Sequence, residues 1–213
     1  MKKIYLSMAV LALTFTACKE ETTPPGETET AKDTIVQQET VPEQPMDSAA
    51  IAQAWQNYMT PGNAHKMLAE EEGSWNCEMT FWMGPDGNPE KYTSSADIKM
   101  VMGGRYQEAN YKGDMMGMPF EGKSTVAFDN TTEEYTSTWI DNMGTGMMVM
   151  RGKMSPASQK MVLKGEMVDP ATGKAKPVRE VYSVIDENTR KMEMYDNHNG
   201  KEYKSMEIIM TRK

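Results

Sequence analysis

The 213-residue chain has 31 acidic and 23 basic residues and a formal net charge of −8. Because it is acidic and has no basic stripe, its composition argues against nucleic acid as a partner. It has only two histidines and contains no Ser-His-Asp order, Gly-x-Ser-x-Gly, P-loop or His-Glu-x-x-His motif, so we expect no enzyme.

Residues 1–17 have the three parts of a secretory signal peptide. Lys2-Lys3 form a basic segment, residues 4–15 form an apolar segment, and the small residues Thr16-Ala17 follow. The apolar run has about a dozen residues, whereas a helix that crosses a bilayer needs about 20. This segment therefore predicts export rather than a membrane-spanning helix.

Phe15-Thr16-Ala17-Cys18 resembles the lipobox of bacterial lipoproteins, in which the cysteine takes a diacylglyceryl thioether. The resemblance implies lipidation at Cys18, and more than one acyl chain gives stable membrane attachment. The following Lys19-Glu20-Glu21 resembles the signal that sends lipoproteins of Bacteroidetes-like bacteria to the cell surface. We therefore expect a lipid-anchored envelope protein, at the outer membrane and open to surface exposure. The alternative is an ordinary secretory signal followed by a chance cysteine.

Residues 18–47 predict a disordered acidic tether. The segment is rich in Thr, Glu, Pro and Gln, has no aromatic residue, and holds two basic residues against eight acidic ones. Such a segment cannot bury enough apolar surface to offset its ordering entropy. With Cys18 lipidated, Cys77 has no intrachain disulfide partner, and we expect it to be a buried, inert thiol.

The remaining residues, 48–213, suit one domain that begins with helical segments. In residues 51–59, Ile51, Trp55 and Tyr58-Met59 recur at helical spacing and form one apolar stripe. Pro61-Gly62 ends this helix, and a second helical turn is predicted over about 65–72.

From Trp75 onward the apolar period becomes two. One face of the first predicted strand carries Trp75, Cys77, Met79, Phe81 and Met83. Similar segments follow, separated by clusters of Gly, Pro, Asn and Asp that favour turns. We predict the further strands near 91–102, 105–112, 120–129, 133–141, 146–153, 159–168, 177–186, 190–196 and 202–211.

About ten short strands with no long helix between them predict hairpin connections and an antiparallel sheet. An open twisted sheet of this size is unusual. We therefore predict an all-β fold: a closed antiparallel up-and-down β-barrel of about ten strands, with the helical segment at one end. A β-sandwich is the alternative.

Gly73-Ser74-Trp75 resembles the opening of the lipocalin and fatty-acid-binding barrels, in which an indole closes the barrel base. In those barrels a basic residue from the last strand covers the indole. The resemblance implies this role for Arg212, through a cation–π contact with Trp75 and capping of carbonyl groups.

A longer series of motifs is similar to the bacterial family called "domain of unknown function 1579". The resemblance covers about residues 50–213 and implies a lipocalin-like, calycin-type barrel without an agreed activity. The motifs are Gly84-Pro85, Met102-Gly103-Gly104-Arg105-Tyr106, Gly117-x-Pro119-Phe120-Glu121-Gly122, Phe128-Asp129, Trp139-Ile140-Asp141, Asp169-Pro170-x-Thr172-Gly173-Lys174 and Glu193-Met194-Tyr195.

A barrel of ten strands leaves room for a ligand, so we expect binding of a small apolar or amphipathic molecule. Methionine is the compositional outlier, with 23 residues, and it suits the wall of an adaptable cavity. If Arg105 faces the interior, it would bind a ligand carboxylate; otherwise it is a solvated arginine. The other predicted wall residues are Met79, Phe81, Met100, Met102, Trp139, Met161, Met194 and Met206.

Three alternatives stay open. A filled barrel would be an interaction or structural domain of the envelope, and an interior below about 300 Å³ would favour it. Met115-Met116-x-Met118 and Met147-Met148-x-Met150 are soft ligands that suit Cu(I), although no histidine or cysteine accompanies them. Haem would need a proximal ligand such as His198, which the turn composition places in water. We expect no cofactor and no metal.

Overall fold

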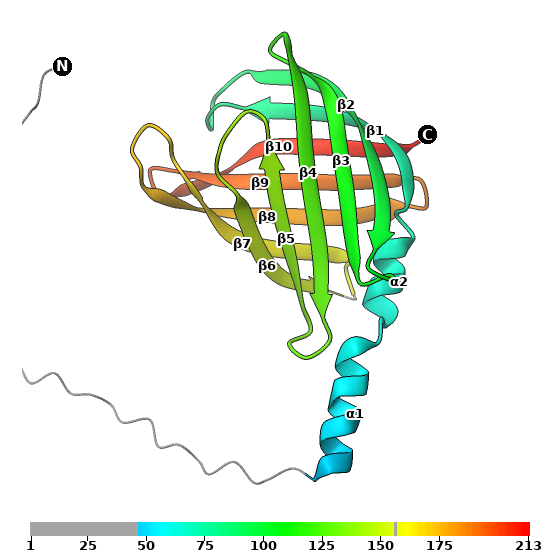
Figure 1. Ribbon diagram of the computed structural model, residues 1–213. Helices are drawn as coiled ribbons and strands as arrows, with labels where there is room; N and C mark the ends of the chain where they lie inside the picture. Colours follow the sequence, from blue (N-terminus) through cyan, green and yellow to red (C-terminus); the bar gives the residue numbers. More distant parts are fainter. Residues whose placement is uncertain (1–46, 156) are drawn as a thin grey trace, which may run out of the picture. The chain divides into compact units, whose positions relative to one another are not determined.

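The computed structural model describes residues 47–155 and 157–213, so the predicted signal peptide, Cys18 and nearly all of the predicted tether lie outside the described residues. Two short helices precede ten strands (Figure 1). The helices are α1 (Ser48–Met59) and α2 (Asn63–Ala69), and the strands are β1 (Gly73–Trp82), β2 (Pro89–Val101), β3 (Tyr106–Met115), β4 (Met118–Asp129), β5 (Glu134–Asp141), β6 (Met148–Ser155), β7 (Lys160–Val168), β8 (Ala175–Asp186), β9 (Thr189–His198) and β10 (Lys201–Arg212). Within these residues, neither helix has the length and apolar character that a bilayer span requires.

The ten strands form one closed antiparallel ring in chain order. Each strand pairs with the next, and β1 pairs with β10 from Trp75↔Arg212 to Phe81↔Met206. The predicted up-and-down barrel is therefore confirmed, and the sandwich alternative is wrong. Closure leaves no strand edge unpaired, which removes the usual route to edge-to-edge association.

Several element boundaries differ from the sequence prediction by a few residues. The second helix ends at Ala69, and residues 70–72 form the turn that leads into β1. Strand β1 begins at Gly73 and ends at Trp82, so Met83 lies beyond it and is 77% exposed rather than facing inward. The period-two pattern thus continued one residue past the point where the chain turns.

Helix α1 lies against the barrel only through its C-terminal end. Its N-cap is Asp47, whose carboxylate accepts a hydrogen bond from the Ala50 amide at 2.8 Å. At the other end Asn130 Nδ2, in the β4–β5 turn, donates to the carbonyl oxygens of Asn57 and Thr60. No residue of α1 is buried, so the apolar stripe that the sequence predicts is exposed.

The core divides into two clusters rather than one. The first centres on Trp75, Cys77 and Met210 and occupies the first strands together with β10. The second centres on Leu68, Met150 and Leu163, which come from α2 and the middle strands. A barrel that is completely filled by its own side chains would join these clusters into one. The division indicates a space between them.

Candidate ligand-binding site

A cavity of about 400 Å³ lies inside the barrel, between the two core clusters. Its wall is mostly apolar, and methionine is the commonest residue on it. These methionines are Met67, Met79, Met115, Met116, Met143, Met148, Met150, Met154, Met161, Met192, Met194, Met206 and Met210. Flexible thioether side chains can adapt to varied apolar shapes, so this wall suits an apolar guest.

The helical end of the barrel is sealed around Trp75. The indole is fully buried, and its Nε1–H donates to the Glu71 carbonyl oxygen at 2.9 Å. The Arg212 guanidinium lies 4.4 Å from the ring centroid and donates to the carbonyl oxygens of Glu70 and Glu72, each at 2.7 Å. Arg212 thus occupies the position that the resemblance to lipocalin barrels implies, and it satisfies carbonyl groups in the turn after α2.

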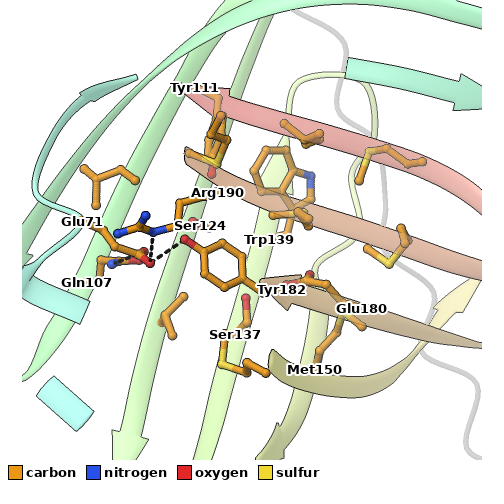
Figure 2. A pocket seen from close by; sticks show the side chains of 18 of the residues that line it. Glu71, Gln107, Tyr111, Ser124, Ser137, Trp139, Met150, Glu180, Tyr182 and Arg190 are labelled. Atoms are coloured by element: carbon orange, nitrogen blue, oxygen red, sulfur yellow. Dashed lines mark hydrogen bonds and ion pairs between the residues drawn. The ribbon is translucent and has the colours of Figure 1, made fainter. Parts of the chain in front are cut away.

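Above this seal, four side chains form a polar network around Glu71 (Figure 2). The Glu71 carboxylate accepts hydrogen bonds from Tyr182 Oη at 2.5 Å, Gln107 Nε2 at 3.0 Å and Arg190 Nε at 3.3 Å. Arg190 is only 3% exposed, and it also donates to the carbonyl oxygen of Thr189 at 3.1 Å. A buried ion pair of this kind is tolerated because its remaining hydrogen-bonding groups are also satisfied.

Three aromatic side chains form another part of the wall. Trp139 meets Tyr111 edge to face, with centroids 5.2 Å apart, and lies nearly parallel to Phe120 at 6.4 Å. Gly122, on β4, leaves the space for this indole, since a Cβ at that position would lie 2.5 Å from the Trp139 ring. Trp139 Nε1 donates to the Asp141 carboxylate at 2.6 Å, which fixes the orientation of the indole.

Glu180 is the second buried carboxyl group on the wall. It lies on the inward face of β8, between Leu163 of β7 and Met194 of β9, and is 7% exposed. Among the described residues, Glu180 has no hydrogen-bond or ion-pair partner. Every fully buried side-chain oxygen in this part of the chain does have a hydrogen-bond partner, so the Glu180 oxygens are not fully buried. Its carboxylate oxygens therefore border the cavity. Burial raises the pKa of Glu180 to about 7.

The far end of the cavity reaches the hairpin turns opposite α2. Met116, in the β3–β4 turn, and Met143, after β5, belong to the wall and are 59% and 44% exposed. Met67 of α2, at the other end, also belongs to the wall and is 39% exposed. Because Met116 and Met143 are more exposed than Met67, the far end is the candidate entrance.

Residues 60–212 match the model of a family described as "Protein of unknown function (DUF1579)". The chain belongs to this family. The match spans α2 and the whole barrel, so the resemblance found in the sequence motifs is confirmed. No curated protein matches the chain.

Among solved structures, the DUF1579 barrel is similar to the crystal structure of Rv2717c from M. tuberculosis, with a TM-score of 0.52. The two are 14% identical, and the alignment covers 72% of this chain and 99% of Rv2717c. At this level of identity the likeness shows the fold alone.

Six of the predicted wall residues line the cavity, namely Met79, Phe81, Trp139, Met161, Met194 and Met206. Arg105, Met100 and Met102 do not. Strand β3 begins at Tyr106, so Arg105 belongs to the preceding turn and cannot follow the alternation of the strand. Its Nη2 instead donates to the Met59 carbonyl oxygen at 2.7 Å, where a cation satisfies the C-terminus of α1.

The two methionines outside the wall have different surroundings. Met102 lies in the same turn as Arg105, with a φ of 51°, and is 73% exposed. Met100 packs against the second core cluster, and its amide donates to the Glu72 carboxylate at 2.7 Å.

Neither histidine lines the cavity. His65 is buried in α2, where its Nδ1 accepts a hydrogen bond from the Gly62 amide at 3.1 Å, and burial lowers its pKa. His198 ends β9 and is exposed. The described chain therefore offers no imidazole to a haem in this cavity.

The two methionine motifs are not brought together as one set. Met115, Met116, Met148 and Met150 line the cavity, but Met118 and Met147 do not and are 48% and 63% exposed. Among the described residues, no group of three or more His, Cys, Asp or Glu side chains is placed to hold a metal ion.

Sequence reasoning missed Glu71, Gln107, Tyr182, Arg190 and Glu180. The hydrogen-bonded partners of Glu71 lie 36 to 119 residues away along the chain. For the four residues on strands, the only local signal is a polar side chain at an inward position, which can be recognised only once the inward face of the strand is known. Glu71 lies in the turn before β1 and has no such signal.

We predict that Glu71→Gln lowers the free energy of unfolding by about 3 kcal/mol, because it leaves the Arg190 guanidinium buried without a counter-charge. Urea denaturation followed by tryptophan fluorescence would measure the change. The exposed neighbour gives a matched control, and Glu70→Gln should change stability by less than about 0.5 kcal/mol. Equal losses in the two variants would contradict a buried ion pair at Glu71.

We also predict a pH-dependent effect of Glu180→Gln. Because the Glu180 pKa is about 7 in the folded chain and near 4.5 in the unfolded one, the folded state holds an extra proton between these values. Wild-type stability should therefore fall as the pH rises through this range, and the variant should gain about 3 kcal/mol relative to it. Denaturation at pH 4.5 and pH 8 checks this, with the exposed Glu166→Gln as a control that shows no such difference.

Proposed function

We propose that this protein is a bacterial lipoprotein, anchored to the outer membrane through Cys18, whose barrel binds a small apolar or amphipathic molecule. The observation that carries the proposal is the methionine-rich cavity of about 400 Å³. Ligand pockets in proteins have volumes of about 300 to 1,000 Å³ and mostly apolar walls. We propose binding rather than catalysis as the function of this cavity.

The same volume argues against the alternative of a filled barrel that serves only as a structural or interaction domain. Such a barrel would have one continuous core and an interior below about 300 Å³. The two separate core clusters and the solvent contact at Met116 and Met143 favour a site that a guest can enter.

The anchoring part of the proposal rests on the sequence. Phe15-Thr16-Ala17-Cys18 supports lipidation, and the acidic segment that follows supports a tether between the lipid and the barrel. We propose that the tether holds the barrel away from the membrane, so that the barrel binds its ligand in the aqueous phase of the envelope or at the cell surface.

A cavity-filling variant tests ligand binding. We predict that the fluorescence of N-phenyl-1-naphthylamine increases when it binds the purified barrel, and that Ser137→Phe weakens this binding by about tenfold or more. Ser137 lies on the wall, whereas the next residue of β5, Thr138, is on the opposite side of the strand and does not line the cavity. Thr138→Phe is therefore the matched control and should bind as wild type does. Equal binding by both variants would place the probe outside the cavity.

The anchor is tested separately. We predict that the full-length protein fractionates with membranes when expressed in a bacterium that processes lipoproteins, and that Cys18→Ser moves it to the soluble envelope fraction. A single acyl chain gives only marginal membrane binding, so loss of the whole thioether-linked anchor should release the protein. Membrane retention of Cys18→Ser would contradict anchoring through this cysteine.

A further inference from the structure

We propose that the ligand is an amphipathic molecule with a cationic nitrogen, and that Glu180 binds this nitrogen while the methionine wall holds the apolar part. This inference rests on the proposed ligand-binding function of the cavity. It names the ligand class from Glu180, which, among the buried charged side chains that the structure describes on the cavity wall, is the one without a partner in the protein.

The first argument is the position of Glu180. Glu180 is only 7% exposed, and it lies on the cavity side of β8 with Tyr182 and Val184. Figure 2 shows Glu180 on the wall together with Trp139 and Met150. Burial of a carboxylate without a partner is costly, so such a group is a candidate for binding a complementary ligand.

The second argument is the contrast with Glu71 in the same cavity. Tyr182, Gln107 and Arg190 all donate to the Glu71 carboxylate. That group therefore has its hydrogen bonds within the protein and its negative charge compensated by Arg190. Glu180 has neither among the described residues, although both carboxylates are equally buried at 7% exposed.

The third argument concerns the charges that surround Glu180. The residues that pair with it, Leu163 on β7 and Met194 on β9, are uncharged. The other titratable groups on the cavity wall are Glu70, Glu71, Asp141, Tyr111, Tyr135, Tyr182 and Arg190. Cys77 belongs to the first core cluster and is not on the wall, and burial raises its pKa to about 11. Because Arg190 is the only cation of this set and pairs with Glu71, the wall has an excess of negative charge.

This balance selects among ligand head groups. A carboxylate would meet only like charge at Glu180, and like charges in a low-dielectric site repel strongly. An ammonium group would instead form a charge-assisted hydrogen bond. The aromatic faces of Tyr111, Phe120 and Trp139 on the same wall favour a cation further.

The titration of Glu180 agrees with the geometry. Burial raises its pKa to about 7, so the carboxyl group is mostly ionised at pH 8 and mostly protonated at pH 6. An ammonium ligand binds the ionised form, so its affinity should fall as the pH falls through 7. An aliphatic amine keeps its charge over this range, since its own pKa is close to that of lysine.

Competition against N-phenyl-1-naphthylamine, with three ligands that share a ten-carbon chain, tests the proposal. We expect decylammonium to bind the wild-type protein at pH 8 about tenfold more tightly than decanol, and decanoate to bind most weakly. Between pH 8 and pH 6 the affinity for decylammonium should fall by about tenfold, while that for decanol stays constant. This pH series needs no variant.

Two variants complete the test. Glu180→Gln should remove the preference for decylammonium and its pH dependence while leaving decanol binding unchanged. Glu166→Gln, which removes an exposed carboxylate of β7, should behave as wild type.

The outcomes separate the two proposals. If decanol displaces the probe but decylammonium binds no more tightly, or if Glu180→Gln keeps the preference, the cationic ligand class is wrong and the binding function stands. If neither the probe nor any of the three ligands binds, both proposals are wrong.

Discussion

The pairing of β1 with β10 gives this chain an interior. Seven residue pairs, from Trp75↔Arg212 to Phe81↔Met206, join the two ends of a ten-strand sheet that would otherwise stay open. Closure turns the alternation of each strand into a division between solvent and lumen. It also brings Arg212 over Trp75 and against the turn after α2, so the strand pairing that closes the ring also seals one end of it.

Within that interior, two buried carboxylates have different hydrogen-bonding surroundings. Glu71 takes part in a network that ties the turn after α2 to β3, β8 and β9. Glu180 borders the cavity with no such network. The satisfied ion pair ties the closed end together. Under the proposed binding function, the carboxyl group that borders the apolar cavity would add selectivity for the head group of a ligand.

Much of the fold follows from local patterns in the sequence. Alternating apolar residues and Gly, Pro, Asn and Asp turns located ten strands, and the number of strands predicted closure. The exact residues at which strands begin and end were harder to predict from the sequence. Arg105 was predicted to begin a strand that in fact begins one residue later, at Tyr106, and Met83 was predicted to belong to a strand that ends one residue earlier, at Trp82. An error of one residue at such a boundary moves a side chain from the lumen to a turn.

The sequence by itself determined the strand count, the antiparallel meander and an apolar, methionine-rich lumen, because these depend on residues close together in the chain. It also carries Phe15-Thr16-Ala17-Cys18, the lipobox-like motif on which the proposed anchor rests. Only the tertiary structure decided which polar groups meet and which stay alone. The partners of Glu71 are up to 119 residues away, and the isolation of Glu180 depends on what β7, β9 and the opposite wall place around it. Contacts across a closed barrel are set by register and curvature, which no local pattern encodes.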